Sequence, residues 1–215
     1  MPEIDLLDRY PKPKRDLKAR SQSSEEDREI AKKFGFEYFD GPRSQGYGGY
    51  RYDGRWKPVV ERFAQHYGLS AQSKILDVGC AKGFMLNDFR DAIPGVTVAG
   101  VDVSPYAIEN AMPSVKPFLQ VGDARELPFA NRSFDLVIAI NTIHNLKLED
   151  LKRSLRELQR VSKHAFLTVD AYHNVEERER MLMWNLTAET HMFVNEWKTL
   201  FKEVGYTGDY YWFIP

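Results

Sequence analysis

The sequence predicts an α/β fold, a doubly wound and mostly parallel sheet of six or seven strands, preceded by an N-terminal extension of helix and loop. From residue 74 onward, short apolar segments rich in β-branched residues alternate with amphipathic helical segments, a spacing typical of a parallel sheet covered on both faces. Of the 215 residues, 43% are hydrophobic and 28% charged, an ordinary globular balance. We expect an N-terminal arm, helix and lid loop at 1–55 and a core domain at 56–215.

The N-terminal extension has three parts. Residues 1 to about 22 are polar, and their basic side chains suit either a solvated arm or an anion-binding segment; these are Arg9, Lys12, Lys14, Arg15, Lys18 and Arg20. The segment 23–35 predicts a helix, because Ser23 or Ser24 can cap it, acidic residues fill its first turn and Gly35 ends it. Residues 41–56, GPRSQGYGGYRYDGRW, are too irregular for a helix and too rich in glycine for a central strand, so they predict a loop.

The core domain follows in order. Helices are predicted where apolar residues recur at helical spacing, as Leu148, Leu151, Leu155 and Leu158 do, and strands where apolar runs are short. The predicted strands are 74–79, 96–102, 117–123, 133–141, 165–172 and 210–214, and the predicted helices are 57–68, 84–93, 104–112, 148–161 and 193–206.

Charge and composition exclude several classes of protein. The net charge of -1 argues against a nucleic-acid-coating protein, which usually has a basic excess. The single cysteine, Cys80, excludes an internal disulfide and a cysteine-rich zinc site, and we expect no metal. No apolar run approaches ~20 residues, and the first residues lack the apolar core of a signal peptide. We therefore expect a cytoplasmic protein without a membrane span.

The stretch ILDVGCAKGF, residues 75–84, has the order strand, glycine turn, helix. Such a turn lets backbone N–H groups approach a ligand closely. Gly79 and Gly83 are spaced G-x-x-x-G with Ala81 between them, which departs from the dinucleotide pattern G-x-G-x-x-G and lacks the Gly-Lys-Ser/Thr of a phosphate-binding loop. The turn alone could also serve packing.

Polar side chains follow the next three predicted strands. Asp102 ends the second strand, where a carboxylate can accept hydrogen bonds from both hydroxyls of a ribose. Asp123 ends the third and could accept from an adenine amino group, with the N–H of Ala124 beside it. The fourth strand is followed by Asn141, His144 and Asn145. All these ends lie on one edge of the sheet, where open α/β folds bind ligands.

Taken together, the segments DVGCAKG, GVDVSPYAIENA, VGDARELPF and FDLVIAINTIHNL resemble the successive motifs of class I S-adenosylmethionine-dependent methyltransferases over residues 56–213. The similarity is greatest to the small-molecule branch with the ubiquinone and menaquinone enzymes. It implies a Rossmann-like methyltransferase fold with S-adenosyl-L-methionine as cofactor. The implied cofactor contacts are Asp77, Gly79, Cys80, Gly83 and Asn141 around the methionine part, Asp102 on the ribose, and Val103, Asp123 and Ala124 around the adenine.

Two departures from the family pattern are visible. The family commonly has glycine where Ala81 stands, so the backbone there is expected to differ slightly. The family also usually has a seventh, antiparallel strand, whereas YYWFI at 210–214 is the sixth predicted strand. We expect either a six-stranded sheet or further residues beyond Pro215 in the natural protein.

His144 is the leading candidate for a general base, because the family faces its substrate after the fourth strand and imidazole titrates near neutral pH. The alternative is that His144 only shapes the pocket. Asp170, Tyr172 and His173, at the end of the fifth strand, form a second group. The predicted substrate contacts are Tyr47, Tyr50, Arg51, His144, Asn145 and Tyr172. Arg43 or Arg51 could hold an anionic group of the substrate or of the cofactor.

The sequence Asn-Thr-Ile-His after the fourth strand differs from the Asn-Pro-Pro-Tyr type that accompanies methylation of planar amines. We therefore expect methyl transfer to an oxygen or amine of a small metabolite, anionic ones included, with carbon left open. The alternatives are a methyltransferase acting on RNA or protein and a non-catalytic module that binds S-adenosylmethionine. The sequence predicts neither the acceptor nor the oligomeric state.

Overall fold

The computed structural model describes residues 2–12 and 15–215 and confirms the predicted α/β fold. Lys14 lies outside the described residues. The strands follow the order β3-β2-β1-β4-β5, and both β6 and β7 pair with β5. Every pairing recorded between these strands is parallel. Their bounds are β1 Lys74–Val78, β2 Thr97–Asp102, β3 Leu119–Val121, β4 Phe134–Ile140, β5 Ser162–Tyr172, β6 Met192–Phe193 and β7 Asp209–Phe213.

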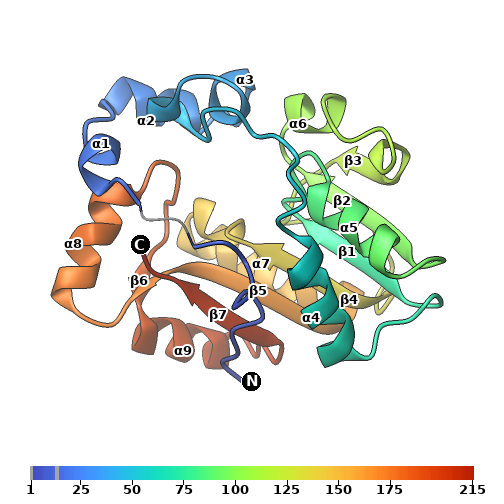
Figure 1. Ribbon diagram of the computed structural model, residues 1–215. Helices are drawn as coiled ribbons and strands as arrows, with labels where there is room; N and C mark the ends of the chain where they lie inside the picture. The colour runs from blue at the N-terminus through green and yellow to red at the C-terminus, as the bar shows by residue number, and fades with distance from the viewer. Residues whose placement is uncertain (1, 13–14) are drawn as a thin grey trace.

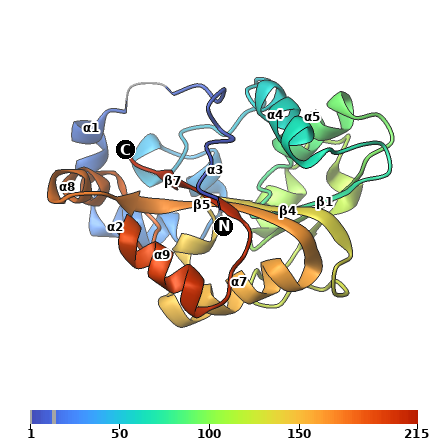
Figure 2. The same ribbon diagram turned by 90° about the horizontal axis from the view of Figure 1, so that it is seen from below.

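Helices cover both faces of the sheet (Figures 1 and 2). On one face, Phe63 of α4 (Lys57–Tyr67) and Phe89 of α5 (Phe84–Ala92) pack with Ile75 of β1. On the other face, Leu155 of α7 (Leu148–Val161) and Trp197 of α9 (Val194–Glu203) join a second apolar cluster. The central strands are buried on both sides, which explains why their sequences are continuous apolar runs and do not alternate.

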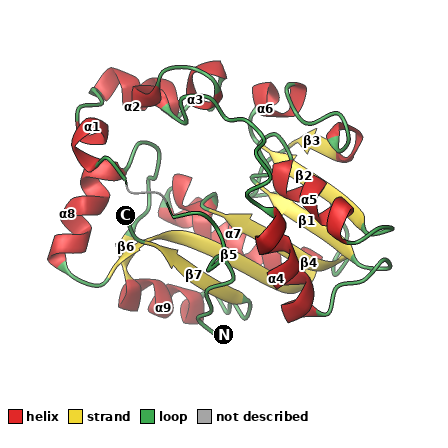
Figure 3. Ribbon diagram, viewed as in Figure 1, coloured by secondary structure: helices red, strands yellow, loops and turns green. Residues whose placement is uncertain are grey.

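The N-terminal extension folds over the carboxyl ends of the strands (Figures 1 and 3). The predicted helix 23–35 is shorter in the structure, where α2 spans Glu25–Ala31 and the left-handed Phe34, with φ 50°, separates it from a further helix at Phe36–Phe39. Four helical segments in this part and after β5 were not predicted, namely Leu17–Ser21, Phe36–Phe39, the 3-10 turn Arg43–Gln45 and Val175–Trp184. The remaining helices are α1 Leu17–Ser21, α2 Glu25–Ala31, α3 Phe36–Phe39, α6 Pro105–Glu109 and α8 Val175–Trp184, and the 3-10 turns are Arg43–Gln45, Lys116–Phe118 and Ile143–Asn145.

The free side of β7 is partly covered by the N-terminus. Glu3 forms a parallel bridge with Tyr210, and the N–H of Ile4 donates to the carbonyl of Tyr210 at 3.0 Å. In the described residues, β7 is parallel to β5, and no antiparallel strand joins the sheet; the seventh strand is the two-residue β6. Pairing of this edge with residues 2–4 removes part of the open hydrogen-bonding row that an edge strand presents.

Among residues 2–12 and 15–215, every helix is too short or too polar to cross a bilayer.

Candidate active site

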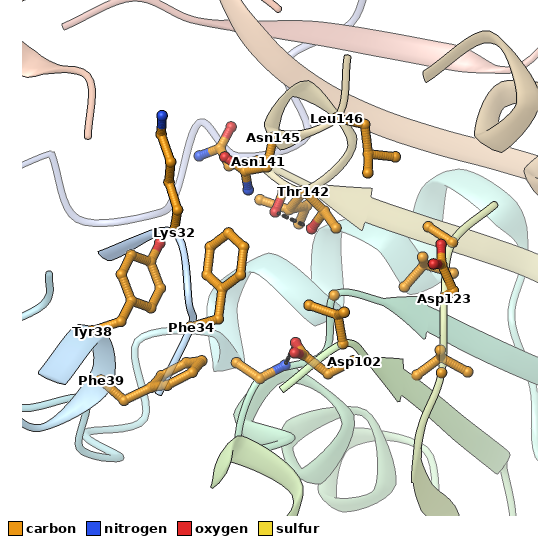
Figure 4. A pocket seen from close by; sticks show the side chains of 18 of the residues that line it. Lys32, Phe34, Tyr38, Phe39, Asp102, Asp123, Asn141, Thr142, Asn145 and Leu146 are labelled. Carbon is orange, nitrogen blue, oxygen red and sulfur yellow. Dashed lines mark hydrogen bonds between the residues drawn. The ribbon is translucent and has the colours of Figure 1, made fainter. Parts of the chain in front are cut away.

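A cavity of about 330 Å³ lies at the carboxyl edge of the sheet. In Figure 4, Asp102 and Asp123 lie on its sheet side, while Lys32, Phe34 and Tyr38 face them from the N-terminal extension. This position is the one that open α/β sheets use for ligands. The residues that line the cavity are Lys32, Lys33, Phe34, Tyr38, Phe39, Tyr47, Val78, Gly79, Ala81, Val101, Asp102, Val103, Gly122, Asp123, Ala124, Arg125, Ile140, Asn141, Thr142, Asn145 and Leu146.

The glycine turn after β1 brings backbone against the cavity. Gly79 has φ 81°, and a Cβ at this position would lie 2.1 Å from Oγ1 of Thr142, so only glycine fits. Ala81 has φ 49°, the left-handed conformation that a glycine adopts readily. Gly83, with φ 75°, begins α5 behind the turn and does not line the cavity. Cys80 is buried, and burial raises the pKa of its thiol, so it packs as an apolar residue.

Asp102 is fixed by two backbone donors. Its Oδ2 accepts from the N–H of Ala81 and its Oδ1 from the N–H of Ser104, both at 2.8 Å. Burial raises its pKa, and these two hydrogen bonds oppose that rise. A carboxylate oxygen has two acceptor positions, so each oxygen keeps one for a ligand in the cavity. This arrangement fits two adjacent hydroxyls, as in a ribose.

Asp77 lies at the end of β1, one residue from the cavity wall formed by Val78 and Gly79. Burial, together with the charge of Asp102, raises the pKa of Asp77 to about 7. An ammonium group beside Asp77 would favour the ionised carboxylate.

Asp123 and Ala124 follow β3 and line the cavity. The guanidinium of Arg125 donates to both oxygens of Asp123, at 2.6 Å from Nη2 to Oδ2 and 3.0 Å from Nε to Oδ1. The hydrogen bonds from Arg125 lower the pKa of Asp123, so the carboxylate is ionised and held in one orientation. Arg125 also lines the cavity and was not predicted from the sequence.

Backbone strain is concentrated at the cavity. In the described residues, four non-glycine residues have positive φ, and Phe34, Ala81 and Asn141 line the cavity. Asn141 is held by Thr168, whose Oγ1 accepts from the Asn141 N–H at 3.0 Å and donates to Asn141 Oδ1 at 2.8 Å. Strained conformations of this kind cluster at functional sites, where the surrounding structure enforces them.

The candidate base, His144, does not line the cavity. Its ring is buried, and its Nδ1 accepts from the N–H of Asp170 at 3.0 Å. Burial lowers the pKa of His144 to about 3. Nδ1 lies 3.2 Å from Oδ1 of Asp170, but this contact is not an ion pair because the ring is neutral. The neighbouring Asn145 lines the cavity, and its buried Oδ1 has no hydrogen-bond partner in the described residues.

The remaining predicted substrate contacts are spread around the cavity. Tyr47 lines it, whereas Tyr50 stacks on Phe84 with ring centroids 4.7 Å apart. Arg51 is exposed and outside the lining residues, and the buried Tyr172 donates to the carbonyl of His191 at 3.3 Å. The structure thus gathers the predicted adenosine contacts together more closely than the predicted substrate contacts.

Sequence reasoning missed the opposite wall, formed by Lys32, Lys33, Phe34, Tyr38 and Phe39. The sequence predicts the first three only as the end of a helix. The side-chain hydroxyl of Ser104 donates to the carbonyl of Phe34 at 2.5 Å, 70 residues away, and this tertiary contact had no local signal. Gly35 was the one available sign that the chain turns at this point.

Comparisons with known proteins agree with this geometry. Residues 75–165 match the family model described as methyltransferase domain. Over 114 residues, the chain is 35% identical to a demethylmenaquinone methyltransferase of Thermotoga maritima, covering 52% of this chain and 47% of that one. Over 144 residues, it is 29% identical to a tRNA (carboxymethyluridine(34)-5-O)-methyltransferase of Arabidopsis thaliana, covering 66% of this chain and 34% of that one.

The solved structure of the YcgJ protein from Bacillus subtilis superimposes with a TM-score of 0.55 at 22% identity, covering 67% of this chain and 66% of that one, and so shares the fold. The chain spans less than two thirds of the length of the first curated relatives that it matches, 41% and 64%. Residues 75–165 therefore match a methyltransferase domain, and this match implies S-adenosylmethionine as the methyl donor.

Proposed function

We propose, from the premise that residues 75–165 are an S-adenosylmethionine-dependent methyltransferase domain, that this chain methylates an oxygen or amine nitrogen of a small metabolite. S-adenosylmethionine supplies a methyl group that its positively charged sulfur already activates. The task left to the protein is to bind both molecules in line and to exclude water, and positioning of this kind can supply roughly 7 to 11 kcal/mol in favourable cases.

For the cofactor, we assign Asp102 to the ribose hydroxyls and the exposed Val103 to one face of the adenine. Asp123 and Ala124 would contact the adenine edge. Gly79, Cys80 and Gly83 would shape the turn beside the methionine part, with Asp77 and Asn141 near its polar groups. Of this set, Asp77, Cys80 and Gly83 lie outside the cavity lining, so we expect the last two to act through the backbone.

The observation that carries the small-molecule proposal is the covered cavity. Phe34 and Tyr38 of the N-terminal extension line it opposite Asp102, and the volume of about 330 Å³ is at the lower end of small-ligand pockets. A wall of this kind restricts the size of an acceptor that can reach the cofactor. The similarity to the demethylmenaquinone enzyme favours the same class of acceptor.

On the acceptor side, we assign Asn145 to substrate orientation. Its unpartnered Oδ1 can accept a hydrogen bond from the hydroxyl or amine that is methylated, although an amide does not take up the proton. We assign His144 to positioning, because it is buried next to Asn145 and bonded to the backbone of Asp170. Tyr47 would form part of the acceptor wall, and Tyr50, Arg51 and Tyr172 would act from outside it.

Calorimetric titration with S-adenosylhomocysteine, the demethylated cofactor, tests the first half of the proposal. Turnover with a panel of small hydroxyl and amine compounds, in wild type and Asn145→Ala, tests the second. We expect Asn145→Ala to keep the affinity for S-adenosylhomocysteine and to lower kcat/KM for the acceptor by roughly tenfold, the cost of one lost hydrogen bond. Absence of heat with S-adenosylhomocysteine would overturn the proposal.

The tRNA methyltransferase among the relatives favours a second candidate, an RNA acceptor. RNA binding through phosphates weakens steeply as salt rises. Retention of RNA that falls with salt, together with methyl transfer to that RNA and none to the panel, would favour this candidate. Cofactor binding without transfer to either class would favour the non-catalytic module.

A further inference from the structure

Four arginines converge where α1, the loop 43–47 and α8 meet. We call Arg15, Arg20, Arg28 and Arg43 the arginine cluster. The guanidinium carbons of Arg15, Arg20 and Arg43 lie 5.6, 5.1 and 5.6 Å from the ring centroid of Trp184, at the end of α8. The guanidinium of Arg28 donates to the carbonyl of Asn185.

The arginine cluster lacks negative partners. Within residues 2–12 and 15–215, no carboxylate lies within salt-bridge distance of any of its four members. Other arginines on the molecule do have such partners, as Arg125 has Asp123 and Arg160 has Glu157. Carbonyl groups satisfy part of the donor set, since Arg20 donates to the carbonyls of Arg43 and Gly46 at 3.0 and 3.1 Å.

Bringing these charges together is costly. Arg20 is 7% exposed, and burial, with added repulsion from Arg43 and Arg28, lowers its pKa to about 10. Burial likewise lowers the pKa of Arg15 and Arg43. Arg20 is the buried member of the cluster, whereas Arg15 and Arg28 are half-buried and Arg43 is exposed. A buried charge without a counter-ion is strongly unfavourable, and stacking on Trp184 offsets only part of that cost for Arg20. A bound anion would remove the repulsion and use the free donors.

None of the four arginines lines the cavity, but hydrogen bonding connects the arginine cluster to the cavity wall. Arg20 holds the carbonyl of Gly46, directly before the lining residue Tyr47. On the other side, Arg15 lies over the ring of Phe213 at 4.5 Å, and its charge acts on Asp170, which contacts His144. In Figure 4, Asp102 and Asp123, which we assign to the adenosine, lie across the cavity from Lys32 and Tyr38 of the N-terminal extension.

We propose that the arginine cluster binds an oxyanion, a phosphate or carboxylate group carried by the methyl acceptor. The placement on the acceptor rests on the proposed function, while the anion site itself does not. Guanidinium groups suit this ligand because their donors match phosphate and carboxylate oxygens in pairs. Through Arg15 and Arg20, this proposal favours the anion-binding interpretation of the basic stretch at residues 9–20.

Inorganic phosphate is the probe for the site. Thermal unfolding is followed while phosphate replaces chloride at constant ionic strength, in wild type, Arg15→Gln, Arg43→Gln and the control Arg153→Gln. Arg153 is an exposed arginine that pairs with Glu126 away from the cluster. Arg153→Gln therefore removes one positive charge, as each cluster variant does, but leaves the cluster itself intact. We expect saturable stabilisation in wild type and Arg153→Gln, and a dissociation constant weaker by roughly tenfold or more in both cluster variants.

Equal stabilisation by phosphate and chloride, or equal phosphate affinity in all four proteins, would overturn the anion site. Titration with S-adenosylhomocysteine separates this failure from failure of the proposed function, because it needs no anion. Phosphate that displaces S-adenosylhomocysteine would assign the arginines to the cofactor carboxylate and overturn the proposal. In turnover assays, competition between phosphate and the acceptor supports an acceptor-borne anion, whereas activation by free phosphate overturns that placement.

Discussion

The carboxylate of Asp102 and the backbone N–H of Ala81 meet at 2.8 Å, although 21 residues separate them. This hydrogen bond joins the end of β2 to the glycine turn after β1. The side chain that we assign to the ribose therefore also fixes the turn that we assign to the methionine part. Cofactor affinity and local backbone structure are coupled at this point.

Asp102→Asn tests that coupling. Both oxygens of Asp102 accept from backbone N–H groups, so an amide nitrogen in place of either oxygen faces another donor. We expect the affinity for S-adenosylhomocysteine to fall by roughly 10- to 100-fold and the stability by about 1 to 3 kcal/mol. Calorimetry and denaturant unfolding measure the two quantities.

Asp135→Asn is the matched control for Asp102→Asn. Asp135 also accepts a backbone N–H, that of Lys74 at 2.8 Å, but it lies at the opposite end of the sheet. We expect it to lose stability without losing cofactor affinity. Equal loss of affinity in the two variants would remove the specific role of Asp102.

Ala81→Gly and Gly79→Ala form an opposed pair in the turn. Ala81 already has φ 49°, so glycine relieves strain, and we expect unchanged cofactor affinity with stability changed by about 1 kcal/mol or less. Alanine at position 79 would place Cβ 2.1 Å from Thr142 Oγ1 and displace that side chain from the cavity wall. We expect Gly79→Ala to lose most of its affinity for the cofactor. Calorimetry in which Ala81→Gly binds the cofactor more weakly than Gly79→Ala would contradict this account.

Asp77→Asn should separate stability from function. Burial raises the pKa of Asp77 to about 7 in the folded state, whereas the pKa of this carboxyl is 3.8 in the unfolded chain. The folded state therefore binds the carboxyl proton more tightly than the unfolded chain does. The destabilisation from ionising Asp77 therefore grows from about pH 4 to pH 7 and is constant above it, reaching ~4 kcal/mol. We expect Asp77→Asn to be more stable than wild type at pH 8, with the difference shrinking at pH 5, and to bind S-adenosylmethionine more weakly.

Guanidinium unfolding at the two pH values measures this difference for Asp77→Asn. A stability difference that is the same at pH 5 and pH 8 would show that the Asp77 pKa is not raised.

Lys82 links the glycine turn to the N-terminal extension. Its Nζ donates to Oδ2 of Asp40 at 2.6 Å and to the carbonyl of Tyr50 at 3.1 Å, and the Lys82 side chain is 9% exposed. Because Asp40 is partly exposed, we expect Lys82→Met to cost about 2 kcal/mol, less than breaking a fully buried pair. A double-mutant cycle with Asp40→Asn measures the coupling.

The exposed pair of Lys12 and Asp5 is the control for that cycle, with a coupling of at most about 1 kcal/mol expected. Coupling energies of equal size in the two pairs would show that Lys82 does not anchor the extension.

The sheet could be predicted because its strands are buried on both faces and carry a continuous apolar signal, as in Phe134–Ile140. The polar residues at its carboxyl edge follow from the same strands, which places Asp102, Asp123 and Asn141 without further information. By contrast, α8 buries only Met181 among its residues and has little apolar periodicity to detect. The left-handed Phe34 and the bond between Arg125 and Asp123 depend on tertiary and turn geometry that residue spacing does not encode.

His144 gives the last prediction, which distinguishes a base from a positioning residue. Burial lowers its pKa from 6.5 to about 3, so the folded state binds this proton less tightly than the unfolded chain. The neutral ring therefore stabilises the fold fully above pH 6.5, and this stability is lost as pH falls toward 3. We expect the imidazole resonances of His144 to show no titration between pH 5 and 8 in NMR spectra. We expect His144→Ala to lower the free energy of unfolding by about 2 to 4 kcal/mol, because it leaves a cavity and an unpartnered N–H at Asp170.

The turnover of His144→Ala should fall without a change in the pH profile between 6 and 8. A limb near pH 6.5 that disappears in His144→Ala would instead make His144 the base.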